Sequence, residues 1–143
     1  MIEIYDITDS GCDWSGVEKI GESMVDSLVD VTLCDDDHIR RLNHTHRSID
    51  RATDVLSFPI SGEIPGTPLG SIVISIETAR RVAQRLGHSL HEEVALLLIH
   101  GILHLQGYDH ETDDGEMRKE EKRWIDHFGL PESLIVRNST NED

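Results

Sequence analysis

Residues 89–107, SLHEEVALLLIHGILHLQG, form the most apolar stretch of this 143-residue chain. Ser89 and Glu92 have the spacing of a capping box, in which each side chain accepts a hydrogen bond from the other residue's backbone N–H at the start of a helix. Gly107 is of the residue type that commonly ends a helix. The stretch therefore predicts a helix over 90–106, buried at the centre of the fold with the other elements packed against it.

Around this helix the chain shows patterns with periods of two and of 3.6 residues, which are typical of strands and of helices. Either Asp13 or Ser15 is suited to cap the first helix. The predicted order of elements is βαβαββααα. We expect strands over 2–7, 31–34, 54–59 and 69–75, and helices over 13–29, 35–47, 76–87, 90–106 and about 113–128.

This order predicts an α+β fold built on a small mixed sheet. The first two helical crossovers favour parallel pairing of strands, whereas the Gly- and Pro-rich loop at 61–68 favours a hairpin. We therefore expect a sheet of about four strands with one antiparallel edge, and helices packed around the central apolar helix. The length fits a single domain over 1–130, followed by a C-terminal tail at 131–143 that is expected to fray.

The composition is that of a soluble globular protein, with 37% hydrophobic and 29% charged residues. No apolar run approaches the length of a membrane span, and the N-terminus lacks the basic and apolar regions of a secretory signal. Cys12 and Cys34 form no CxxC pair, which favours two free thiols in a reducing compartment. We expect a cytoplasmic protein with no membrane partner.

The charge is strongly acidic overall but unevenly distributed. A net charge of −15 argues against nucleic acid as a partner, because an acidic surface repels phosphates. Arginines nevertheless gather in two stretches, 38–51 and 79–85, so an anionic partner stays possible.

Three of the nine histidines fall within eleven residues, His100–His110. His100 and His104 are four residues apart and share one face of the predicted helix, and a reversal at Gly107 can return His110 to the same point. A single buried histidine is more often a hydrogen-bonded core residue, but three unpaired imidazoles would carry a desolvation cost that a metal removes. Three nitrogen ligands with an open fourth position are typical of a catalytic zinc site. We expect one Zn²⁺ here, although imidazole also suits other divalent metals.

The spacing also matches the HExxHxxGxxH pattern of zinc peptidases, except that Gly101 stands where those enzymes have the general-base Glu. The expected architecture is thus zincin-like, but the peptidase proton carrier is missing. A glycine there is expected to leave open space beside the metal. Three neutral ligands leave the site close to a charge of 2+, which favours an anionic substrate such as a phosphodiester over a peptide.

The same residues resemble a known family. HGILHLQGYDH at 100–110 is similar to the HGxLHLxGYDH signature of the YbeY proteins, which are bacterial ribosomal-RNA maturation factors and metal-dependent endoribonucleases. NHTHRSIDRATDVLSFP at 43–59 and LGSIVIS at 69–75 resemble further blocks of that family, and the likeness spans about residues 1–130.

The resemblance implies a function and a set of site residues. His100, His104 and His110 would bind the metal, usually zinc, and Arg51 would be the basic residue of the cleft. The activity implied is cleavage of single-stranded RNA (EC 3.1) in maturation of the 3′ end of 16S ribosomal RNA and in ribosome biogenesis. The implied partners are ribosomal RNA and the small ribosomal subunit, with no DNA substrate.

Arg51, Asp109 and Asp54 each allow a functional and a structural interpretation. The Arg51 guanidinium could contact a phosphate and offset charge in the transition state, or it could pair with Asp50 or Asp54. Asp109 could carry a proton beside His110, or could be a solvated turn residue. Asp54 could orient a ligand imidazole, or could cap a turn.

Two further functions remain open at the level of sequence. The first is a ribosome-assembly protein that binds RNA without turnover and whose metal stabilises the fold. The second is a zincin-type peptidase, which Gly101 disfavours. Loss of activity on substitution of His100, with folding and RNA binding intact, would separate the enzyme from the binding protein.

Overall fold

The computed structural model describes residues 1–60 and 67–131 and confirms the α+β class and the order of elements. Most of the expected loop at 61–68 and all of the predicted tail except residue 131 lie outside this range, so the division into a domain and a tail stays a prediction. The strands are β1 (Ile2–Asp6), β2 (Val29–Cys34), β3 (Val55–Pro59) and β4 (Gly70–Ser75). The helices are α1 (Ser15–Met24), α2 (Asp36–Arg47), α3 (Ile76–Leu86), α4 (Leu90–Leu105) and α5 (Glu116–Phe128).

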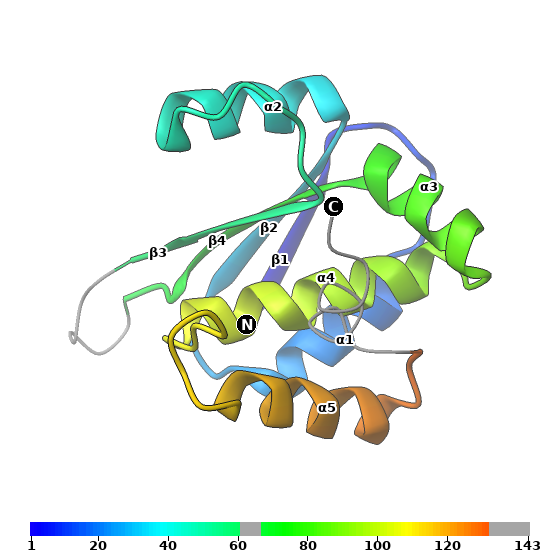
Figure 1. The fold of residues 1–143 in the computed structure, drawn as a ribbon. Helices are drawn as coiled ribbons and strands as arrows, with labels where there is room; N and C mark the ends of the chain where they lie inside the picture. Colours follow the sequence, from blue (N-terminus) through cyan, green and yellow to red (C-terminus); the bar gives the residue numbers. More distant parts are fainter. Residues whose placement is uncertain (61–66, 132–143) are drawn as a thin grey trace.

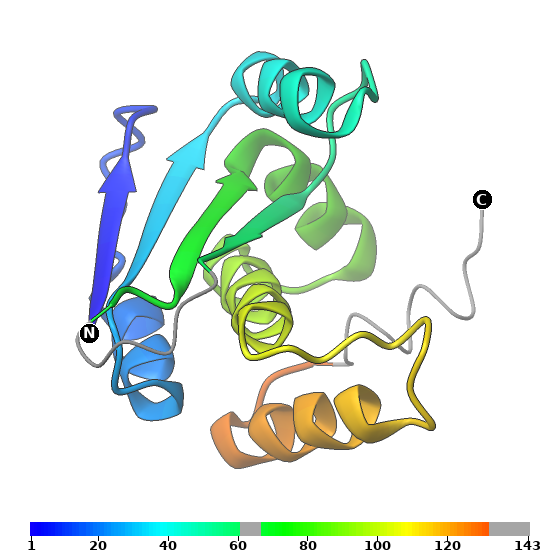
Figure 2. The same cartoon turned by 90° about the vertical axis from the view of Figure 1, so that its left-hand side faces the viewer.

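The four strands form one mixed sheet in the order β1-β2-β4-β3, in which only β3 runs antiparallel to its neighbour. The antiparallel edge is therefore confirmed, but the parallel pairing expected after the second crossover is wrong, because β4 lies between β2 and β3. Ile72, Val73 and Ile74 of β4 are all buried, as an interior strand requires. Pro59 has no N–H to donate to a ladder, which suits β3 to the edge. Figure 2 shows β1 and β3 at the two opposite edges.

Helices cover both faces of the sheet (Figure 1). Residues of α1, α3 and α4 share the larger hydrophobic core with one face, whereas Ile39 of α2 packs with Leu56 and Val73 on the other. Helix α5 packs against α4 in a further layer. None of the helices in the described part of the chain has the length and hydropathy needed to cross a membrane.

Two helices, α1 and α5, differ by more than one residue from their expected bounds. Helix α1 ends at Met24 because Val25 is extended, with φ −137° and ψ 146°, and Val29 already pairs with strands on both sides. Trp14, rather than Asp13 or Ser15, occupies the capping position, and Asp13 Oδ1 accepts a hydrogen bond from the Ser15 backbone N–H (3.0 Å) at the start of the helix. The last helix begins at Glu116, after a left-handed Gly115 with φ 99°.

Helix α4 has the predicted capping box between Ser89 and Glu92 and is almost wholly buried. It lies close to the sheet at Gly101. A Cβ added to Gly101 would lie 3.0 Å from Ile72 Cδ1 and 3.2 Å from Ser57 Oγ, so the expectation of open space at this residue is wrong. The glycine instead allows α4 to lie directly against β3 and β4, where Ser57 Oγ donates a hydrogen bond to the Gly101 carbonyl oxygen (3.3 Å).

Candidate metal centre

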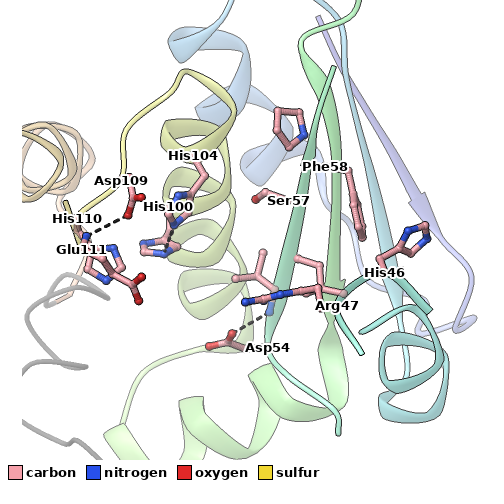
Figure 3. A pocket seen from close by; sticks show the side chains of 13 residues that line it. His46, Arg47, Asp54, Ser57, Phe58, His100, His104, Asp109, His110 and Glu111 are labelled. Atoms are coloured by element: carbon pink, nitrogen blue, oxygen red, sulfur yellow. Dashed lines mark hydrogen bonds between the residues drawn. The ribbon is translucent and has the colours of Figure 1, made fainter. Parts of the chain in front are cut away.

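The three histidines predicted as ligands come together at the end of α4 (Figure 3). His100 and His104 lie one turn apart near the C-terminus of the helix, and Gly107, with φ 98°, lets the chain turn back so that His110 joins them. One ring nitrogen from each residue lies within 4.8 Å of the other two. His100 is buried, His104 is half-buried and His110 is exposed, so the cluster opens to solvent on one side.

The hydrogen bonds of two rings assign their protons. His104 Nδ1 lies 3.1 Å from the Tyr108 carbonyl oxygen, which can only accept, so this nitrogen carries the proton. His100 Nδ1 lies 2.9 Å from Glu121 Oε2, which accepts in the same way. When both rings are neutral, each Nε2 atom carries a lone pair, and the two Nε2 atoms face each other at 3.1 Å. Two facing acceptors repel unless a cation lies against both, so the donor set fits a divalent metal such as zinc.

The electrostatic surroundings support the same form of His104. Burial lowers the pKa of His104, and positive charge on the neighbouring His100 would lower it further, so the surroundings favour the neutral ring. Neutral imidazole is the form that a metal ligand needs, because a protonated ring has no lone pair to offer.

Glu121 is a site residue that the sequence reasoning missed. It lies on α5 and its side chain is fully buried. A sequence signal does exist: Met117, Glu121 and Ile125 are four residues apart and form the buried stripe of α5, so an acidic residue occupies a core position. A buried carboxyl is costly unless it has a partner, and here His100 is one.

A pocket of about 670 Å³ adjoins the histidines. Its walls come from the end of α2, from β3, from α4 and from the turn after α4, as Figure 3 shows. The lining residues are His46, Arg47, Asp54, Val55, Leu56, Ser57, Phe58, Pro59, His100, His104, Asp109, His110 and Glu111.

Arg51 is not among the residues that line this pocket. Arg51 is exposed. Its backbone carbonyl oxygen accepts a hydrogen bond from Asn43 Nδ2 (2.9 Å), and this bond links the turn before β3 to α2. The pairing with Asp50 considered above is not seen, since Asp50 lies 3.8 Å from Arg40 instead. A phosphate contact by Arg51 stays a prediction.

Arg47 lines the pocket instead, and the sequence reasoning missed it. It is the last residue of α2, directly before the left-handed Ser48 that ends the helix. Its position at the end of a basic helix, just before the turn into an edge strand, is the signal that could have marked it.

Asp109 and Asp54, two acidic residues that line the pocket, differ in their exposure and in their hydrogen bonds. Asp109 is exposed, and its side chain accepts a hydrogen bond from the Glu111 backbone N–H (3.0 Å), so it shapes the turn that carries His110. Asp54 accepts from the Val55 backbone N–H (2.8 Å), and burial raises the pKa of its carboxyl. Among the described residues, the carboxyl that bonds a candidate ligand ring is that of Glu121, not that of Asp54.

Three imidazoles that converge beside an open pocket are the arrangement of a metal-dependent hydrolase. Residues 14–129 match a family model described as Endoribonuclease YbeY. A protein named Endoribonuclease YbeY from Nautilia profundicola is 50% identical over 138 residues, which cover 96% of this chain and 99% of that protein. A protein of the same name from Nitratiruptor sp. is also 50% identical over 138 residues, or 96% of this chain and 95% of that protein. The chain therefore belongs to the endoribonuclease YbeY family, as its motifs suggested.

A solved structure agrees with the fold. The solution structure of a protein from Thermotoga maritima matches with a TM-score of 0.63 and 30% sequence identity, over 100% of this chain and 96% of the other.

Proposed function

We propose that this protein cuts single-stranded RNA with the help of one zinc ion held by His100, His104 and His110. Its family membership supports the endoribonuclease activity. The observation that carries the metal site is the pair of Nε2 atoms that face each other at 3.1 Å while both Nδ1 atoms have acceptors elsewhere. A divalent ion held by these residues would supply Lewis-acid chemistry for phosphodiester hydrolysis.

The chain's own residues position the RNA against the histidines. The Arg47 guanidinium lies in the same pocket as the three rings and can bind a phosphate through two parallel N–H groups. We assign it the contact with the scissile phosphate and its developing charge. Arg51, four residues further on and outside the pocket lining, is proposed as a contact to a neighbouring phosphate.

Asp109 is proposed as the proton carrier. It lines the pocket next to His110, and its exposed position allows exchange of protons with solvent.

The distribution of ion pairs reconciles RNA binding with the acidic net charge. Arg40 and Arg41 both pair with Asp37 on their own helix, at 3.4 Å and 3.2 Å. Within residues 1–60 and 67–131, by contrast, neither Arg47 nor Arg51 has a carboxylate within 4.0 Å. Arg47, which lines the pocket, and Arg51, four residues further on, thus keep a charge that is available to phosphates.

We place this activity in the cytoplasm, in maturation of the 3′ end of 16S ribosomal RNA, with the small ribosomal subunit as partner. The family membership supports the RNA substrate. The finer assignment rests on the resemblance of the two signature motifs.

The test compares substrates and variants. Zinc-loaded protein should cut a defined single-stranded RNA, cut the same sequence far more slowly as a duplex, and leave an unstructured peptide intact. His104→Ala should abolish cleavage while RNA binding, measured by fluorescence anisotropy, survives. RNA binding by wild-type protein with no cleavage under any metal condition would instead identify a ribosome-assembly protein. Cleavage of the peptide alone would identify a peptidase, although Gly101 stands where zinc peptidases have their general-base Glu and a side chain at this position would be crowded.

A further inference from the structure

We propose that Glu121 is a positioning residue for the metal centre, which holds His100 in the orientation and tautomer that a metal ligand needs. This inference rests on the metal site proposed above. The Glu121 carboxyl on α5 reaches His100 Nδ1 on α4 at 2.9 Å, with Glu121 fully buried and His100 7% exposed. The pair therefore links the two helices directly at the site.

Packing alone does not explain a carboxyl at this position. The other buried residues of α5, Met117 and Ile125, are apolar, and the helix packs against the apolar surface of α4. An apolar side chain of similar volume would satisfy the same packing without the cost of burying a polar group. The carboxyl must therefore be explained by what it bonds to, and one bonded group is the imidazole of a candidate ligand.

The bond to Glu121 decides which nitrogen of His100 can bind a metal. An acceptor at Nδ1 places the ring proton there and leaves the Nε2 lone pair directed at the point shared with His104. Without that acceptor, the proton is free to move to Nε2, and the ring is free to turn away. For His104, the backbone carbonyl oxygen of Tyr108 is the acceptor at Nδ1. For His100, the acceptor at Nδ1 is a side chain, that of Glu121.

The chain offers a matched control on the same helix. His88 Nε2 lies 2.7 Å from Glu93 Oε1, and Glu93 is also fully buried whereas His88 is half-buried, so this is a second histidine–glutamate pair with a buried carboxyl. It lies at the opposite end of α4 from His104 and contributes no ligand to the cluster. A purely structural role of such pairs should give the same consequences at Glu93 and at Glu121.

The experiment measures metal binding by the full chain in four forms: wild type, Glu121→Gln, Glu121→Ala and Glu93→Gln. Zinc affinity is measured by competition with a chromophoric chelator, and the ligand geometry by the visible absorption spectrum of the Co²⁺-loaded protein. Removal of a group that orients a metal ligand typically lowers metal affinity 10- to 100-fold. We expect a loss near the upper end for Glu121→Ala, together with a changed Co²⁺ spectrum.

Glu121→Gln should lose about tenfold, because the amide keeps the volume and an acceptor oxygen but not the charge. If Glu121→Ala fails to fold, Glu121→Gln alone tests the effect of Glu121 on zinc affinity. Glu93→Gln should lower the melting temperature of the apo protein while zinc affinity and the Co²⁺ spectrum stay as in wild type.

Unchanged zinc affinity and an unchanged Co²⁺ spectrum in both Glu121 variants would overturn the inference and leave the metal site standing. An equal loss of affinity in Glu93→Gln would also overturn it, in favour of general destabilisation. A wild-type chain that binds neither metal would overturn the proposed function and this inference together.

Discussion

Replacement of Arg47 by alanine should cripple cleavage without harming the fold. Arg47 is exposed at the end of α2 and pairs with no carboxylate among the described residues, so its removal should change the free energy of unfolding by no more than about 0.5 kcal/mol. Loss of one group that stabilises transition-state charge typically lowers the rate 10²- to 10³-fold, or about 2.7–4 kcal/mol. We expect a loss of about 10²-fold, since the exposed pocket leaves this contact partly screened by water.

The assay is single-turnover cleavage of a defined single-stranded RNA by zinc-loaded protein, with metal content and melting temperature measured on the same samples. Arg47→Lys should recover only part of the rate, because an ammonium keeps the charge but not the two-pronged contact. Arg51→Ala is the matched control: outside the pocket lining, it should weaken RNA binding modestly and reduce its salt dependence. If Arg51→Ala slows cleavage more than Arg47→Ala does, the assignment of the two arginines is reversed.

Three other predictions concern metal removal, packing and thiol reactivity. Chelation should lower the melting temperature by about 5–10 °C, because metal at 100 times its Kd stabilises the native state by about 2.7 kcal/mol. The metal-free protein should stay folded, and complete unfolding in calorimetry would mean that the site is structural. Gly101→Ala should destabilise the protein by about 1 kcal/mol in urea titration, because crowding against Ile72 and Ser57 outweighs the gain in helix propensity. The same change at Gly16, where nothing lies within 4 Å of an added Cβ, should be neutral or stabilising. Equal effects at both sites would contradict the packing argument. Burial raises the pKa of the Cys34 thiol to about 12, so a thiol reagent at pH 8 should label Cys12 in the native protein and reach Cys34 only after denaturation; mass spectrometry of the labelled peptides would show the reverse if Cys34 were accessible.

The features that could be predicted from the sequence are those set by residues close together in the chain. The capping box of α4 depends on Ser89 and Glu92, three residues apart, and the meeting of His100 with His104 depends on one helical turn. The return of His110 needs only the glycine that ends the helix. Local geometry therefore sufficed to bring the candidate ligands together.

The features that were missed depend on contacts between distant segments. Glu121 meets His100 across 21 positions, through the packing of α5 on α4, and the choice between Arg47 and Arg51 depends on how the end of α2 sits against β3. The parallel pairing expected after the second crossover was also wrong, because a pattern predicts that a segment is a strand but not which neighbour it pairs with. The greater burial of β4 relative to β3 is what places it inside the sheet.

We propose that His100, His104 and His110 together hold one metal ion on which RNA cleavage depends. The most direct test is to titrate metal-free protein with zinc while following cleavage of a single-stranded RNA and zinc bound per chain. Cleavage should rise with zinc and saturate at about one equivalent, and His100→Ala should cleave at no zinc concentration. Full cleavage by metal-free protein, or unchanged cleavage and zinc content in His100→Ala, would contradict it.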